Sequence, residues 1–253
     1  MIIDGHAHIS REAHSSPELL LADMEAAGVS RAVLVPGGML DVRRMTRFIT
    51  GQERPITTIP PNDVVLEIMR EHPDRFYGFC CINPGDGSEA ALAALDEAHN
   101  NGFKGLKMSP LVHQFAFTGK VSQELAALCA DFNIPYYTHV LFNPNVSTAA
   151  LGELAKSFPK TNFVIGHMGV GPLDIDTIEL AASRDNIYLE TSTANPLAIM
   201  TAIQQAGPDK IFYGSEFPLS DPYVEKVKIE RLRISDEDKE TVLYRTISRL
   251  LGL

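Results

Sequence analysis

The 253-residue sequence lacks the features of several large classes of protein. No apolar run approaches the roughly 20 residues of a membrane-spanning helix, so we do not expect a membrane partner. The first residues do not combine a basic start with an apolar stretch, and we therefore expect no signal peptide. Basic residues are few, since 22 Lys and Arg stand against 32 Asp and Glu. Without Lys and Arg clusters, nucleic acid is not an expected partner either.

Cysteine is also scarce, with only Cys80, Cys81 and Cys129 in the chain. An odd number of cysteines, two of them adjacent inside an apolar segment, is typical of reduced thiols in a cytosolic core. Adjacent cysteines rarely form a disulfide of low strain. We therefore predict a cytoplasmic protein without disulfide bonds.

Strand-like apolar runs alternate with amphipathic helical stretches along the whole chain. Eight runs rich in β-prone residues predict strands at residues 1–4, 31–35, 76–82, 103–108, 136–139, 162–166, 187–190 and 211–213. Helical spacing of apolar residues predicts helices at residues 17–27, 62–72, 88–100, 122–132, 148–157, 175–183, 196–205 and 236–253. We expect Ser15 or Ser16 to cap the first of these helices and Gly28 to end it.

This alternation predicts an α/β fold, a (β/α)8 TIM-type barrel in a single domain over residues 1–253. A doubly wound sheet is the alternative, but no glycine-rich phosphate loop follows the first strand. The widest gap between strands, residues 37–75, should hold an extra loop or short helix that could cap the barrel mouth.

Two histidines, His6 and His8, follow the first predicted strand directly. Side chains two residues apart on a strand point to the same side, so both imidazoles should face one point. Neutral imidazole is a good ligand for Zn, Fe, Ni and Cu. The pair is half of a metal site, or else two histidines that fell close together by chance.

Polar residues end other predicted strands as well, and barrel enzymes place their chemistry at the C-terminal ends of strands. His139 ends the fifth strand, His167 follows the sixth, and Glu216 follows the eighth. Four of the chain's eight histidines and a carboxylate thus stand at four strand ends. This arrangement indicates a metal or catalytic site.

With these motifs in place, the chain resembles the amidohydrolase superfamily. The resemblance rests on His-x-His after the first strand, on the histidines after the fifth and sixth strands, and on an acidic residue in a Gly-Ser-acid-x-Pro turn after the eighth. Within the superfamily the chain is most similar to the amidohydrolase-related group, which includes aminocarboxymuconate-semialdehyde decarboxylase and small metal-dependent hydrolases. Supporting stretches such as GFKGLKMSP and NFVIGHMG spread the resemblance over nearly the whole chain.

The resemblance implies one divalent metal ion, expected to be Zn, bound by His6, His8 and His139 with Glu216 beside it. It makes His167 an acid, a base or a group that polarises a carbonyl. The family usually has Asp where this chain has Glu216, so the longer side chain must fold back or bind more loosely. Asp221 is the alternative carboxylate, although it lies well past the strand end.

Three further residues are candidates for substrate contact: Lys107 after the fourth strand, His113 in the loop that follows, and Arg11 in the loop after the first strand. In two-metal relatives a lysine after the fourth strand is carboxylated, but the pattern here resembles the one-metal group. Lys107 is then structural or contacts substrate. Arg11 is a carboxylate clamp or a solvated loop residue, and Glu190 is a partner of a ligand histidine or the polar end of its strand.

These residues favour a hydrolase in which a metal-activated water attacks an amide, ester or lactone carbonyl, with Glu216 as the base. The alternative is a metal-dependent non-oxidative decarboxylase of a small carboxylic acid, which would use the same ligands. A third hypothesis is a metal-binding or ligand-binding module without catalysis, suggested only by the Glu in place of Asp at position 216. The expected partner is a small-molecule substrate. A homodimer stays open, because nothing in the sequence decides the oligomeric state.

Overall fold

Eight parallel strands lie side by side in chain order, each hydrogen-bonded to the next. They are described by a computed structural model that covers residues Met1–Leu253. The strands are β1 (Ile3–Ile9), β2 (Arg31–Pro36), β3 (Phe76–Cys81), β4 (Gly105–Met108), β5 (Tyr136–Thr138), β6 (Phe163–Ile165), β7 (Ile187–Glu190) and β8 (Ile211–Phe212). The predicted (β/α)8 barrel is confirmed, and the doubly wound alternative is excluded because no strand changes its place in the order.

Backbone hydrogen bonds between β1 and the segment that follows β8 close the barrel. The amide of Gly5 donates to the carbonyl of Tyr213 at 2.9 Å, and the amide of Glu216 donates to the carbonyl of His6 at 2.8 Å. Farther along, the amide of His8 donates to the carbonyl of Phe217 at 2.7 Å. We call this set of contacts the β1–β8 seam.

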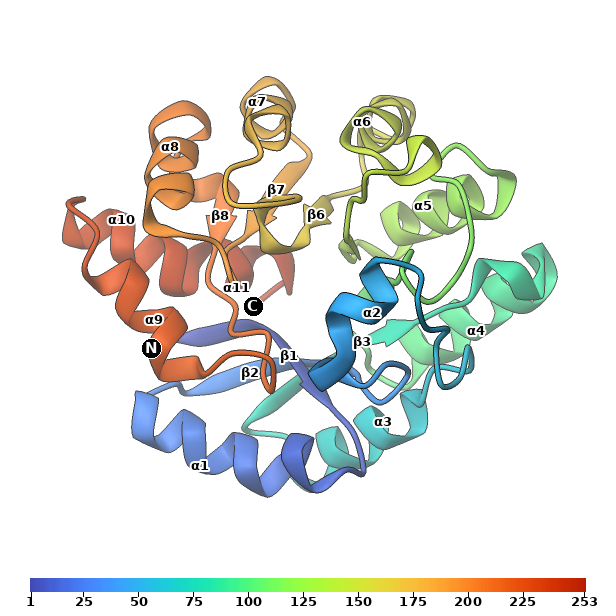
Figure 1. Ribbon diagram of the computed structural model, residues 1–253, viewed down its shortest axis with the longest axis horizontal. Helices are drawn as coiled ribbons and strands as arrows, with labels where there is room; N and C mark the ends of the chain where they lie inside the picture. Colours follow the sequence, from blue (N-terminus) through green and yellow to red (C-terminus); the bar gives the residue numbers. More distant parts are fainter.

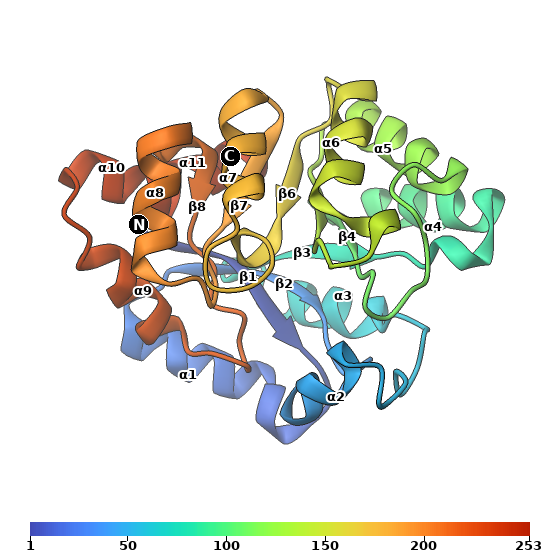
Figure 2. The same cartoon turned by 45° about the horizontal axis from the view of Figure 1, so that its top comes forward.

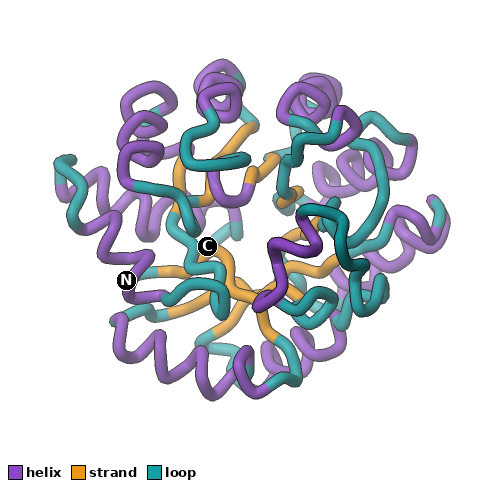
Figure 3. Tube along the Cα trace, viewed as in Figure 1, coloured by secondary structure: helices purple, strands orange, loops and turns teal.

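Helices surround the strands (Figures 1 and 3). They are α1 (Pro17–Ala27), α2 (Met45–Ile49), α3 (Asn62–Glu71), α4 (Ser88–Asn100), α5 (Lys120–Phe132), α6 (Thr148–Ser157), α7 (Ile175–Ser183), α8 (Pro196–Ala206), α9 (Pro222–Glu230), α10 (Asp236–Glu240) and α11 (Thr246–Leu250). The side chain of Ser16 caps α1, and Gly28 ends it with a φ of 69°, as the sequence predicts. No helix of the chain combines the length and apolar character needed to cross a membrane.

The core has two layers. The larger one lies between the strands and the surrounding helices. The smaller one fills the barrel interior with residues such as Ile3, Phe79 and Phe212, which pack against Ile247 and Leu250 of α11. Because Ile3 begins β1, α11 covers the N-terminal end of the barrel and leaves the C-terminal end for the site.

The structure differs from the sequence prediction in three elements. Strand β1 continues to Ile9, so His6 and His8 lie within it rather than after it. The helix expected over residues 236–253 is interrupted by a π-helical turn, Thr241–Arg245, between α10 and α11. Helix α9 was not predicted. The expected short helix between the second and third strands is α2, which lies near the C-terminal end of β1 (Figure 2).

We predict that Gly5→Ala destabilises the protein by about 1–3 kcal/mol, the usual cost of overpacking. A Cβ at this position would lie 2.4 Å from a ring carbon of Phe212 and 3.0 Å from the carbonyl oxygen of Tyr213, at the β1–β8 seam. Urea unfolding would measure the change. Gly152→Ala in α6 is the control, because its Cβ would meet only the flexible end of Leu180 at 3.1 Å. Equal stability of the two variants would contradict the importance of the seam.

Candidate metal centre and active site

A cavity of about 1080 Å³ opens at the C-terminal end of the barrel. Its lining comes from the end of β1, from α2 and α3, and from the loops after β1, β2, β4, β5, β6, β7 and β8. Four of the residues predicted from strand ends line it: His8, His139, His167 and Glu216. His6 is fully buried in the same group of imidazoles, 4.9 Å from the ring of His8 between centroids. The structure therefore brings all five residues together.

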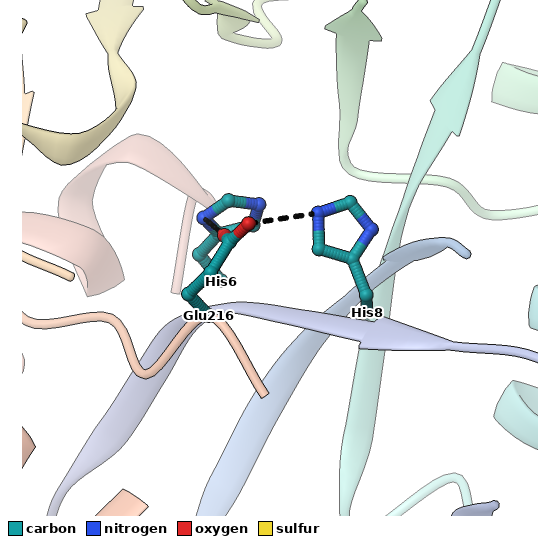
Figure 4. A group of neighbouring side chains, drawn as sticks. All are labelled: His6, His8 and Glu216. Atoms are coloured by element: carbon teal, nitrogen blue, oxygen red, sulfur yellow. Dashed lines mark ion pairs between the residues drawn. The ribbon is translucent and has the colours of Figure 1, made fainter. Parts of the chain in front are cut away.

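His6, His8 and Glu216 form the densest group of donor atoms, with one atom from each lying within 4.8 Å of the others. Alternation along β1 directs both histidines to one side, where Glu216 meets them from the neighbouring segment (Figure 4). Glu216 Oε2 lies 2.8 Å from His6 Nδ1, and Oε1 lies 3.5 Å from His8 Nε2.

The backbone at Glu216 is unusual, with a φ of 56° in the left-handed region. The β1–β8 seam holds it there through the bond from its amide to His6. Burial alone would raise the pKa of the Glu216 carboxyl, but the imidazoles of His6, His167 and His8 beside it hold that pKa well below its ordinary value. The side chain is therefore an ionised carboxylate, and its length brings it among the imidazoles rather than away from them.

The carboxylate of Glu190, at the end of β7, joins several site residues. Its Oε2 atom accepts hydrogen bonds from the hydroxyls of Tyr137 at 2.9 Å and Ser192 at 2.8 Å, and it lies 3.3 Å from His6 Nδ1. Burial alone would raise the pKa of Glu190, but these contacts, above all that with His6, lower it to about 2. Of the two roles considered for Glu190, partner of a ligand histidine is the one its contacts support.

These contacts decide which nitrogen of His6 carries hydrogen. The hydroxyl of Tyr137 donates its hydrogen to Glu190. Its oxygen therefore accepts a hydrogen bond from His6 Nδ1 at 2.8 Å. The other neighbours of Nδ1 are carboxylate oxygens, which only accept. Nδ1 is thus protonated and Nε2 carries the lone pair. In His8, Nδ1 lies 3.2 Å from the carbonyl oxygen of Pro36, which leaves Nε2 with its lone pair in the same way.

His167 is oriented by Ser192 and also has a left-handed backbone, with a φ of 59°. Its Nδ1 lies 2.9 Å from Ser192 Oγ, whose own hydrogen is given to Glu190. Nδ1 therefore donates, and Nε2 is the nitrogen free to exchange a proton. It lies 3.8 Å from Glu216 Oε1, at the cavity.

His139 stacks on His167 with ring centroids 4.7 Å apart and planes 6° apart. Its Nε2 lies 2.8 Å from Lys107 Nζ, which also lies 3.2 Å from His6 Nε2. Burial, reinforced by the charge of Lys107, lowers the pKa of His139 well below its ordinary value, so the imidazole is neutral. His139 lies in the site, and its role as a metal ligand stays a prediction.

The donor set fits a divalent cation. His6 and His8 present imidazole lone pairs, and Glu216 adds an ionised carboxylate whose buried Oε2 makes no well-formed hydrogen bond. Metal-binding histidines typically donate their other ring N–H to a carboxylate or a carbonyl, which is how His6 and His8 are held here.

The other candidates lie apart from this group. Arg11 is 67% exposed at the rim and pairs with Glu67 and Asp63 of α3. His113 does not line the cavity, because its buried Nε2 contacts the carbonyl of Thr58 at 2.9 Å. Asp221 does not replace Glu216, since its carboxylate caps α9 by accepting from the amides of Tyr223 and Val224.

Tyr137 is the functional residue that sequence reasoning missed. From the sequence alone, Tyr137 has no role beyond its place in the predicted strand at residues 136–139. Tyr137 stands two residues before His139, and this spacing on a strand was the signal that it shares the site's side of the barrel.

A family model described as Amidohydrolase matches residues 3–253 of the chain. Among curated proteins no match was found.

Solved structures of the same fold cover the chain almost completely. An uncharacterized TIM-barrel protein from Bordetella bronchiseptica has 18% identity and a TM-score of 0.78, covering 99% of this chain and 98% of that one. A dihydroxybenzoic acid decarboxylase from Polaromonas, with bound manganese and the inhibitor 2-nitroresorcinol, has 16% identity and a TM-score of 0.75, covering 100% and 97%. The 5-carboxyvanillate decarboxylase from Sphingomonas paucimobilis has 16% identity and a TM-score of 0.73, covering 100% and 99%.

We predict that Glu190→Gln weakens metal binding about 10- to 100-fold, as loss of an outer contact to a ligand histidine usually does. Glutamine cannot accept at two oxygens, so His6 Nδ1 and Tyr137 lose part of their support. Competition with a chromophoric chelator measures the affinity. Glu225→Gln is the control, because that buried carboxylate pairs with Lys228 and Ser220 instead. Equal affinities in the two variants would exclude a role for Glu190 in orienting the ligand.

We also predict that the double variant His6→Ala and His8→Ala folds but retains less than about a tenth of an equivalent of divalent metal, because ligand affinity is lost with the imidazoles. Elemental analysis of protein purified without chelators measures the metal content, and circular dichroism checks the fold. Full metal content in the folded variant would contradict the ligand assignment.

Proposed function

The chain belongs to the amidohydrolase family, whose model matches nearly its whole length, and we propose that this metal-dependent enzyme is a non-oxidative decarboxylase of a small aromatic carboxylic acid. This is the alternative that the sequence left open beside hydrolysis. Support comes from two solved structures of the same fold, a dihydroxybenzoic acid decarboxylase and a 5-carboxyvanillate decarboxylase.

One observation of this chain carries the proposal: the same cavity is lined by apolar side chains, by the imidazole of His167 and by residues of the metal donor set. Met39, Val112, Val140, Leu141 and Phe142 line the cavity and offer contacts to a flat ring. His167 and Glu216 stand in the same lining. A ring held between these parts would have its carboxylate near the cation site and its reacting carbon near His167.

Decarboxylation exchanges one bond for another. The bond between the ring carbon and the carboxylate breaks, CO2 leaves, and the electron pair stays on carbon until a proton forms the new C–H bond. We assign this proton to His167 Nε2, since Nδ1 is held by Ser192 and His167 lines the cavity. The carboxylate of Glu216, 3.8 Å from that nitrogen, favours the protonated form of the imidazole by its charge.

A bound divalent cation would supply positive charge that holds substrate oxygens. His6, His8 and Glu216 would hold it, with His139 as the further ligand that the resemblance implies. Imidazole ligands suit Zn, whereas a carboxylate and oxygen donors suit Mn, and the Polaromonas enzyme contains manganese. We therefore propose either Zn or Mn, to be decided by elemental analysis.

Hydrolysis is the second candidate, and a specific observation favours it. The carboxylate of Glu216 is ionised, because nearby imidazoles hold its pKa well below the ordinary value. An ionised carboxylate beside a cation site is suited to accept a proton from water that attacks a carbonyl. Both candidates use Glu216 and His167, so the reaction must be distinguished by product.

The expected cytoplasmic location and a small-molecule partner also stay proposals. All three cysteines are free and buried, which agrees with a reducing compartment. Whether the chain forms a homodimer stays open.

We predict CO2 release from hydroxylated benzoic acids by the Zn- or Mn-loaded protein, with one arene formed per CO2. Headspace CO2 and chromatography of the arene measure the two products together. His167→Asn should lower kcat by at least about 100-fold, the range in which acid–base groups contribute. Hydrolysis of lactones or esters with no CO2 from any acid would refute decarboxylation and establish the second candidate.

A further inference from the structure

Lys107 is a buried lysine whose amine contacts imidazoles rather than a carboxylate. The residue is 2% exposed, and Nζ lies 3.2 Å from His6 Nε2 and 2.8 Å from His139 Nε2. Its third contact is the face of the Tyr137 ring, 3.8 Å from Nζ to the centroid. A buried amine normally pairs with an acid, so this placement between two histidines needs a reason.

The two imidazole nitrogens that Lys107 contacts are those with lone pairs. His6 Nδ1 faces only acceptors, namely Tyr137, Glu190 and Glu216, so Nε2 is unprotonated. As an ammonium, Lys107 has only N–H donors and no acceptor, so its contact with His139 Nε2 also ends on a lone pair. A metal ion binds histidine through the same lone pairs.

We propose that Lys107 competes with the metal ion for His6 and His139, and so keeps the ion weakly held and exchangeable. The proposal rests on the metal centre described above. In the absence of the ion, the amine satisfies two buried imidazoles that would otherwise lack a partner. When the ion binds, the amine must give up at least one of these bonds and stay on the face of Tyr137.

The test is the metal affinity of Lys107→Met, measured without substrate by competition with a chromophoric chelator using Zn²⁺ and Mn²⁺ separately. Methionine is unbranched, fills the space of the lysine stem and keeps contact with the Tyr137 ring. We expect the dissociation constant to fall at least about tenfold, as for removal of one or two competing hydrogen bonds. Lys107→Gln, which keeps an N–H donor, should lie between the variant and the parent.

Lys104→Met is the matched control, since Lys104 directly precedes the same strand and its amide donates to the carbonyl of Gly78 outside the site. Its metal affinity should equal that of the parent. Thermal melting followed by circular dichroism checks that all variants fold. Unchanged affinity in Lys107→Met would overturn the competition. Weaker affinity would overturn it too, and would make the amine a ligand or a support for His139.

The metal-affinity test and the CO2-release test can fail independently of each other. Tighter metal binding with no CO2 release from any acid would leave the competition standing and reject the decarboxylase. Absence of metal binding in the parent and in every variant would reject the metal centre, and the competition with it.

Discussion

The β1–β8 seam is the constraint on which both the barrel and its site depend. The carbonyl of His6 accepts from the amides of Ser215 and Glu216, at 3.2 and 2.8 Å. Asp4 strengthens the seam, because its Oδ1 accepts from the amides of His6 and Ser215 at 3.0 and 2.9 Å. The same bonds close the sheet and set the backbone of Glu216 beside the imidazoles. A fold that did not close here would separate Glu216 from His6 and His8, so stability and function share these contacts.

Buried carboxylates then set the orientation of the imidazole rings and the nitrogen that each leaves free. Glu190 accepts from Tyr137 and Ser192 and lies beside His6 Nδ1, and through Ser192 it orients His167 as well. One side chain on β7 thus sets the free nitrogen of a predicted ligand and of a predicted acid. Burying an ionised carboxylate costs several kcal/mol unless its oxygens are satisfied, and the many donors around Glu190 provide that. These donors and acceptors come from β1, β5 and β7 and from the turns after β6 and β7, so the contacts form only when the barrel has assembled.

The fold and the five central site residues could be predicted from the sequence, because the C-terminal ends of the strands converge in a barrel. His6, His8, His139, His167 and Glu216 follow from that rule alone, without any distance. The partners of these residues could be predicted only in part. The sequence offers Glu190 as a partner of a ligand histidine or as the polar end of its strand, and only the structure shows that it lies beside His6, 184 positions away. Nothing in the sequence brings His113 to the carbonyl of Thr58. Helix α9 escaped prediction for a local reason: Tyr223 and Val224 are exposed in it, so its apolar residues do not follow the helical period.

Glu216 and Lys107 interact electrostatically within the buried part of the site. Two buried carboxylates, Glu190 and Glu216, lie near one amine. Burial lowers the pKa of Lys107 to about 8, against the pull of these two carboxylates, which favour its charged form. The charges of the carboxylates and of the ammonium offset part of one another's cost of burial. Glu216 therefore acts on the metal site in two ways: directly, as a predicted ligand, and indirectly, through the charge of the lysine that contacts His6 and His139.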